Sequence, residues 1–222
     1  MAKDFWPDLH SDPFARERLK RSCELLKCSH HHSVLDVGCH KKEALEFLPK
    51  GIDYTGIDSM NGFEFDGGVD LLFKFDRILC LEVLEHLKYP QKTLQSIVEL
   101  LKPGGIIVIS LPNEATLFHR VRSFFGCIDA EAFSESGKHL HLPSLKQAYS
   151  FVSEYLTVRR VEYYISSGLG CRQGFARIIL QLFPKQILRT LAKSFPSLFS
   201  RGFIFVCSPK SVSQDTLNHQ RS

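Results

Sequence analysis

The sequence predicts an α/β fold built on a doubly wound, mostly parallel sheet with helices on both faces. Short β-prone runs recur at residues 34–37, 54–57, 75–81 and 106–111. An apolar stripe at helical spacing, within residues 90–101, separates the last two runs. Runs of this kind that alternate with helical patterns are typical of a parallel sheet covered by helices.

The first run ends in a glycine turn. Val34, Leu35 and Val37 suit a strand buried on both faces, and Gly38 allows a positive φ or close approach to a ligand. From Ala44 onward the apolar positions take helical spacing. A strand, a glycine turn and a helix together predict a nucleotide-like cofactor site beyond the carboxyl ends of the strands.

The second run ends in Asp58, twenty residues after Gly38. At about this spacing an acid reaches ribose hydroxyls in doubly wound folds. The chain from Asp58 to Phe75 has little helical pattern, and we expect a third strand at residues 69–72.

The remaining chain predicts one domain, residues 14–210, between an irregular lead-in at 1–13 and a disordered polar tail at 211–222. An irregular stretch at 114–142 is expected to form a lid. Further helices are expected at 14–26, 143–155 and 175–198, and further strands at 157–164 and 203–207.

Composition limits the partners and the compartment. The net charge is +4 and most basic residues are scattered, which argues against DNA as a partner. Seven cysteines without a Cys-x-x-Cys pair argue against a disulfide framework and predict a reducing, cytoplasmic location. No apolar run approaches the roughly 18 residues of a membrane-spanning helix.

The segment 175–198 has two interpretations. Its leucine, isoleucine and phenylalanine residues stand beside arginine and lysine, as in helices that lie on a membrane surface. It either covers the sheet edge or makes a peripheral membrane contact that gathers a lipid-linked substrate.

Four segments in order resemble the class I S-adenosylmethionine-dependent methyltransferases. They are VLDVGC at 34–39, YTGID at 54–58, FDRILCLEVLEHL at 75–87 and LKPGGIIVISLPN at 101–113. The resemblance covers about residues 15–165. It implies a Rossmann-like, seven-stranded, mostly parallel sheet whose last strand is antiparallel.

The resemblance also implies which residues hold S-adenosylmethionine. The expected cofactor-binding residues are Asp36, Gly38 and Cys39 after the first strand, Asp58, Ser59 and Met60 after the second, and Leu81 and Glu82 after the fourth. Asp58 would accept hydrogen bonds from the ribose hydroxyls. His40 and Lys42 stand where the family usually has glycines, and this departure supports the alternative of a catalytically silent binding subunit.

A cluster of ionisable residues follows the strand at 75–81. Glu82, Glu85 and His86 are three and four residues apart, so on one helical turn their side chains can converge. Ubiquinone-biosynthesis O-methyltransferases and small-RNA 2′-O-methyltransferases resemble the chain at this Glu-x-x-Glu-His, and there a later histidine completes a divalent-metal site. His139 or His141 would supply it here. Metal-free members carry the same motif, with the acids as caps or hydrogen-bond acceptors, and this interpretation ranks first.

The candidate metal ligands are therefore Glu82, Glu85, His86 and His141, and the candidate catalytic residues are His86, His139 and Glu85. A histidine is the expected general base for a hydroxyl nucleophile. The predicted function is O-methylation of a small molecule or of a glycan- or lipid-linked intermediate. The alternatives are the silent subunit and a metal-assisted RNA 2′-O-methyltransferase.

Overall fold

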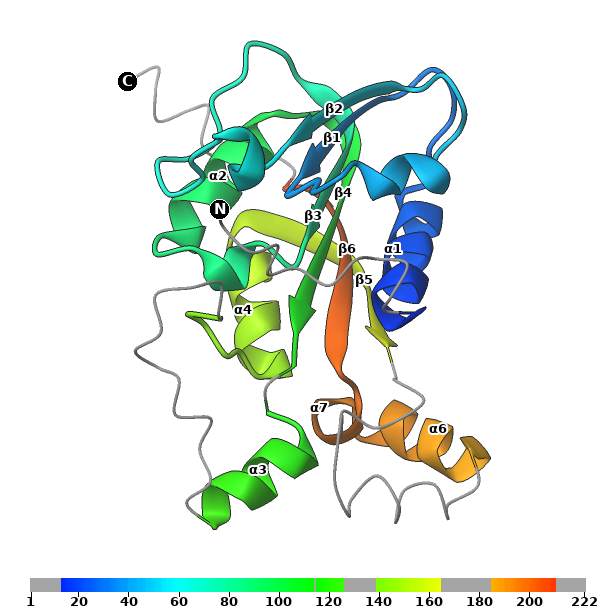
Figure 1. Cartoon of the computed structure of the whole chain (residues 1–222), viewed down its shortest axis with the longest axis vertical. Coiled ribbons are helices and arrows are strands. Elements are labelled where there is room, and N and C mark those ends of the chain that lie inside the picture. Colours follow the sequence, from blue (N-terminus) through cyan, green and yellow to red (C-terminus); the bar gives the residue numbers. More distant parts are fainter. Residues whose placement is uncertain (1–12, 114, 126–138, 165–184, 211–222) are drawn as a thin grey trace, which may run out of the picture.

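The computed structural model describes residues 13–113, 115–125, 139–164 and 185–210 (Figure 1). Its centre is a six-stranded sheet in the order β2-β1-β3-β4-β6-β5. The strands are β1 (Ser33–Val37), β2 (Asp53–Ile57), β3 (Phe75–Leu81), β4 (Leu101–Pro112), β5 (Leu156–Tyr164) and β6 (Gly202–Pro209). β1 to β4 pair in parallel, whereas the last strand, β6, is antiparallel to both of its neighbours. The predicted Rossmann-like α/β fold is confirmed.

The expected third strand is absent from the described residues, and the sheet has six strands instead of seven. Residues 69–72 form an irregular loop, in which the Val69 amide donates to the side chain of Ser96 at 2.7 Å. Leu72 and Phe73 are 93% and 74% exposed, so they have no sheet face to pack against. Gly67 and Gly68 precede this loop, and glycine disfavours extension of a strand.

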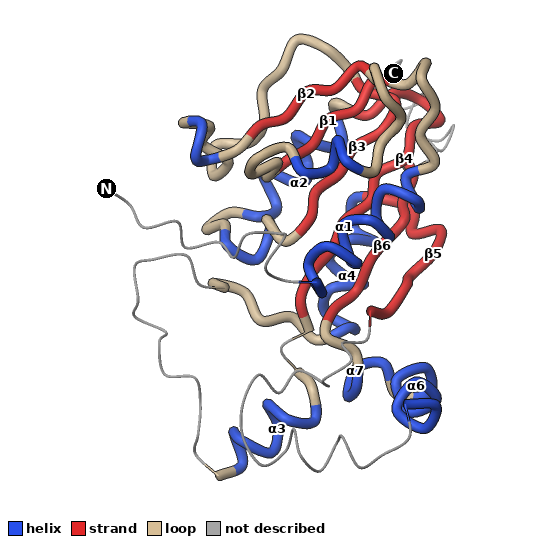
Figure 2. Tube along the Cα trace, turned by 45° about the vertical axis from the view of Figure 1, so that its right-hand side comes forward, coloured by secondary structure: helices blue, strands red, loops and turns tan. Residues whose placement is uncertain are grey.

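Helices cover both faces of the sheet, as Figures 1 and 2 show. On one face α1 (Pro13–Leu26) packs Cys23, Leu25 and Leu26 against β1 and β4. On the other face α2 (Pro90–Glu99) and α4 (Leu145–Tyr155) enclose a second core with Leu94, Ile97 and Val152. These two cores fix the strands whose ends carry the site.

The expected helix after Ala44 is one 3-10 turn, η1 (Glu43–Glu46), and two further turns are η2 (Ser59–Asn61) and η3 (Leu84–His86). α4 begins at Leu145 because Ser144 and Gln147 form a capping box. β4 begins five residues before the expected position, since Leu101 already pairs with Phe75.

Three short helices lie beyond the carboxyl end of β4 and the start of β6 (Figure 1). They are α3 (Leu117–Phe124), α6 (Lys185–Ser194) and α7 (Pro196–Phe199). The expected lid at 114–142 lies partly outside the described residues. Wholly outside them are residues 175–184 of the segment 175–198, the lead-in up to residue 12 and the tail at 211–222. Among the described helices, none has the length and apolar character needed to cross a bilayer.

Candidate cofactor and acceptor site

A cavity of about 460 Å³ opens where the carboxyl ends of β1, β2 and β3 meet. It brings together seven of the eight residues expected to bind the cofactor: Asp36, Gly38, Cys39, Asp58, Ser59, Leu81 and Glu82. The eighth, Met60, is half-exposed and does not line the cavity. The volume lies in the range of small-molecule sites.

The turn after β1 requires glycine. Gly38 has a φ of 77°, and its amide donates to the carbonyl of Ile57 at 2.8 Å. A Cβ at this position would collide with the side chain of Val83. The missing Cβ of Gly38 therefore leaves the space that the Val83 side chain occupies.

His40 and Lys42 both adopt a left-handed backbone conformation, which favours glycine. Their φ angles are 45° and 64°, in the left-handed region that costs a residue with a side chain about 1–2 kcal/mol. The His40 amide donates to Asp58 at 2.7 Å, and its ring contacts Glu43 at 2.9 Å. Lys42 is exposed to solvent. His40 thus lines the cavity, whereas Lys42 does not, and the backbone is left-handed at both positions.

Asp58 anchors the loop after β2. Its two carboxylate oxygens accept the backbone amides of His40 and Met60, at 2.7 and 2.8 Å. Each oxygen keeps lone pairs for a further donor. The carboxylate is therefore held in place at the cavity edge, where ribose hydroxyls would reach it.

Asp36 is a buried carboxyl on the cavity wall, 5% exposed. Burial raises its pKa to about 6, and the negative charges of Asp58 and Glu43 act in the same direction. A hydrogen bond from the Tyr54 hydroxyl, at 2.6 Å, opposes that rise. Burial likewise raises the pKa of the nearby Cys39 thiol to about 11, so this cysteine remains protonated at neutral pH.

Glu82 is the centre of a network that the sequence analysis did not assign. Arg18 of α1 lies 3.1 Å from one carboxylate oxygen, and the other accepts the hydroxyls of Ser110 and Tyr164, at 2.9 and 3.1 Å. Glu82 itself has a φ of 55°. The only signal for Arg18 in the sequence is its place in the basic cluster at 16–21. This network ties the covering helix and β5 to the end of β3.

Glu85, His86 and His139 come together beside the cavity. The Glu85 carboxylate is fully buried, the Nε2 atom of His86 lies 4.0 Å from it, and the two histidine rings are 4.9 Å apart between centroids. One ligand atom from each residue lies within 4.8 Å of the other two. The amide of Leu140 donates to the Glu85 carbonyl at 2.7 Å, which fastens the segment carrying His139.

The other two candidate metal ligands have different partners. Glu82 belongs to the Arg18 network, and the Nε2 atom of His141 lies 2.9 Å from the Leu87 carbonyl. His141 lines a second cavity of about 340 Å³, whose wall includes Glu85. The structure thus groups the three predicted catalytic residues, while their catalytic role remains a prediction.

The sheet order and the covering helices define a Rossmann-like domain with a cavity at its strand ends. Residues 10–155 match the family described as "Methyltransferase domain". The chain therefore belongs to this family, and the predicted membership of the class I S-adenosylmethionine-dependent methyltransferases is confirmed.

Curated relatives match a shorter stretch of the chain. A ubiquinone biosynthesis O-methyltransferase of Pectobacterium atrosepticum is 30% identical over 102 residues, 36% of this chain and 42% of the relative. The enzyme of the same name from Colwellia psychrerythraea is 31% identical over 106 residues, 37% and 42% of the two chains. The match thus spans about two-fifths of the length of these relatives.

Solved structures show the same fold at low identity. The N-methyltransferase NodS from Bradyrhizobium japonicum, in complex with S-adenosyl-L-homocysteine, has a TM-score of 0.50 and 16% identity over 95% of this chain and 94% of its own. A methyltransferase in complex with the Haloferax volcanii Trm112 activator has a TM-score of 0.53 and 19% identity over 90% of each chain.

Proposed function

We propose that the chain is an S-adenosylmethionine-dependent methyltransferase that acts on an oxygen atom of a small molecule or of a glycan- or lipid-linked intermediate. The observation that carries the proposal is the cavity at the strand ends, lined by seven of the residues expected to bind the cofactor. The name of the ubiquinone biosynthesis O-methyltransferases supports oxygen as the acceptor atom.

The cavity fits a cationic cofactor. Four carboxylates line it, from Asp36, Glu43, Asp58 and Glu82, against the single guanidinium of Arg18. Such a wall favours the positive sulfonium and amino groups of S-adenosylmethionine. Gly38 also lines the cavity. Asp58 would hold the ribose, and Asp36 the methionyl part.

The chemistry requires alignment and one proton acceptor. When bound, S-adenosylmethionine supplies a methyl group on positive sulfur, so an oxygen–carbon bond forms as the sulfur–carbon bond breaks and its electron pair stays on sulfur. His86 lines the cavity and would accept the proton of the acceptor hydroxyl. The buried Glu85 carboxylate, 4.0 Å away, would stabilise the protonated imidazole.

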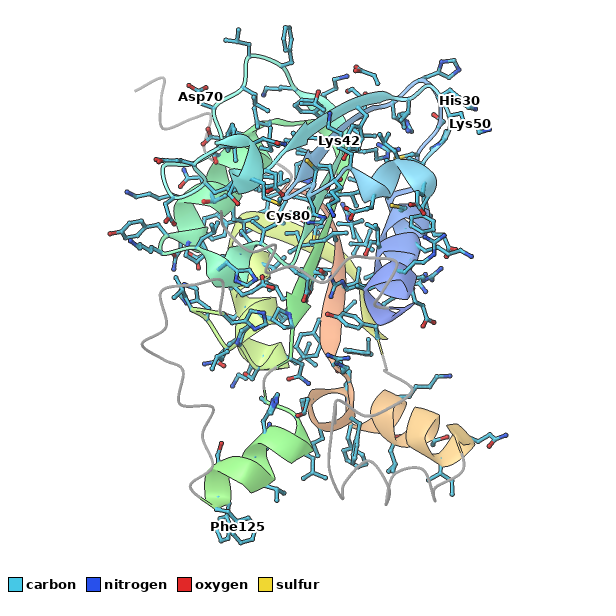
Figure 3. The ribbon with its side chains drawn as sticks, in the orientation of Figure 1. His30, Lys42, Lys50, Asp70, Cys80 and Phe125 are labelled. Atoms are coloured by element: carbon cyan, nitrogen blue, oxygen red, sulfur yellow. The ribbon has the colours of Figure 1, made fainter. Side chains whose placement is uncertain are left out.

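Isothermal titration of the full chain with S-adenosylmethionine and S-adenosylhomocysteine tests this proposal. We expect micromolar binding of both, weakened at least about tenfold in Asp58→Asn because a charge-assisted pair with the ribose is lost. Asp70→Asn is the matched control, since it removes an exposed carboxylate from a loop away from the cavity (Figure 3). Absence of heat at high protein concentration would contradict the proposal and favour the silent binding subunit.

A metal-assisted version is a second candidate, favoured by the grouping of Glu85, His86 and His139. One carboxylate and two imidazoles would hold a divalent transition metal, which would polarise the acceptor oxygen. Titration of Mn²⁺ followed by electron paramagnetic resonance tests this candidate without an acceptor. His139→Gln should abolish the signal of bound Mn²⁺, and the control His141→Gln should keep it. Absence of a bound-Mn²⁺ signal in the unaltered chain would rule the candidate out.

A further inference from the structure

We propose that α3 and α6, which both contact α7, form a docking surface for a bilayer of anionic phospholipid. We call the residues concerned the distal surface; they are Leu117, Val121, Phe124, Phe125, Ile187 and Phe195. The sequence predicts a membrane contact for residues 175–198, and this inference adds α3 to it. The inference does not depend on any step of the proposed reaction.

The first observation is an apolar stripe that faces solvent. Leu117, Val121 and Phe124 are spaced i, i+4 and i+7, which places them on one face of α3, and Phe125 follows directly after the helix. Their exposed fractions are 43%, 47%, 85% and 73%. An amphipathic helix of a globular domain normally turns this face toward the core, whereas on α3 it is open to an apolar partner.

The second helix repeats the arrangement. Ile187 in α6 and Phe195, the residue between α6 and α7, are 47% and 54% exposed, and Leu191 lies between them at the same four-residue spacing. The short helix α7 contacts both α3 and α6. Asn113, after β4, donates to the carbonyls of Ser197 and Ser200 at 3.1 and 2.8 Å and so fixes α7 to the sheet.

The charge of this end identifies the partner. Residues 115–125 and 185–201 contain six lysines and arginines and no acidic residue, although the whole chain has a net charge of only +4. Arg120 and Lys193 are exposed on α3 and α6 themselves. Exposed aromatic residues beside lysine and arginine are the combination that binds an anionic lipid surface.

The position of the distal surface connects it to the site. α3 follows the carboxyl end of β4, and the cofactor cavity opens at the carboxyl ends of the strands parallel to β4. Figure 3 shows Phe125 at the far end of the molecule on this side, pointing away from the sheet. A bilayer bound there would lie toward the edge of the sheet at which the cavity opens.

Co-sedimentation of the full chain with phosphatidylcholine vesicles, with and without 30% phosphatidylglycerol, tests the proposal. We expect binding to the anionic vesicles to be at least about tenfold stronger than to the neutral ones, and to weaken as salt is added. The double variant Phe124→Ala/Phe125→Ala should reduce it by about tenfold or more. Arg120→Gln/Lys193→Gln, which removes two positive charges, should reduce it by about thirtyfold.

The chain offers a matched control for the aromatic variant. Leu72 and Phe73 are also adjacent and exposed, but they precede β3 and so lie at the opposite edge of the sheet (Figure 1). Leu72→Ala/Phe73→Ala should therefore leave vesicle binding unchanged. All the altered side chains are exposed, and far-ultraviolet circular dichroism will verify that the variants fold.

Three results would overturn the proposal. The first is absence of binding to anionic vesicles by the folded, unaltered chain. The second is equal loss of binding in the Phe124→Ala/Phe125→Ala variant and in the Leu72→Ala/Phe73→Ala control. The third is a dimer, measured by light scattering, that Phe124→Ala/Phe125→Ala dissociates, because the distal surface would then pack against a second copy of the chain.

Discussion

The protonation of Asp36 should make folding stability depend on pH. In the folded chain its pKa is about 6, against an ordinary value of 3.8. Between these two values the folded state binds more protons than the unfolded state, so the free energy of unfolding falls as the pH rises. The contribution is complete below about pH 4 and is lost by about pH 7.

The size of this effect follows from the shift of the pKa. About two pKa units correspond to about 3 kcal/mol, and the carboxyl is only 5% exposed, so solvent screening reduces this little. Asp36→Asn removes the titration while its amide oxygen can still accept the Tyr54 hydroxyl. The variant should therefore gain about 3 kcal/mol relative to the unaltered chain when the pH is raised from 4 to 7.

Urea unfolding of both chains at several pH values measures this quantity. Other carboxylates titrate in the same range, but the difference between the two chains cancels their contributions. A difference that changes by less than about 0.5 kcal/mol from pH 4 to 7 would refute the reasoning, because Asp36 would then titrate as it does in the unfolded chain.

Three further predictions concern the site. Affinity for S-adenosylmethionine should rise about tenfold from pH 5 to 7 as Asp36, with its pKa of about 6, ionises, and calorimetry of Asp36→Asn should show a smaller rise. Arg18→Met should lower the free energy of unfolding by about 3 kcal/mol because Glu82 loses its cation. The double variant Arg18→Met/Glu82→Gln should recover most of this free energy. An equal loss of stability in the single and the double variant would contradict the pairing. Lys42→Gly should raise the melting temperature, since the left-handed backbone at φ 64° suits glycine, and Lys41→Gly, whose φ is negative, should lower it.

Local sequence was sufficient for most of the strands. The runs at 34–37 and 75–81 are mostly apolar, a pattern typical of a short strand buried on both faces. The segment 69–72 is also mostly apolar, yet it forms a loop. Its Val69 amide bonds to Ser96, which is distant in sequence, and the local sign against a strand is the glycine pair at 67 and 68.

The site was predicted where it depends on motifs. Asp36, Gly38 and Asp58 end strands that meet at one sheet edge, and their convergence follows from topology. Arg18 belongs to a helix that packs on one face of the sheet, and its pairing with Glu82 depends on how that helix packs. The spacing of the histidines did not indicate which of them lies beside Glu85 and His86. In the structure it is His139, whereas the Nε2 atom of His141 lies near the Leu87 carbonyl.

A crystal structure of the chain grown with S-adenosylhomocysteine tests the central claim most directly. The account predicts that the ligand fills the cavity of about 460 Å³, with its ribose on Asp58 and its sulfur beside Leu81 and Glu82. Clear density for the ligand elsewhere, or an empty cavity at millimolar ligand, would contradict it.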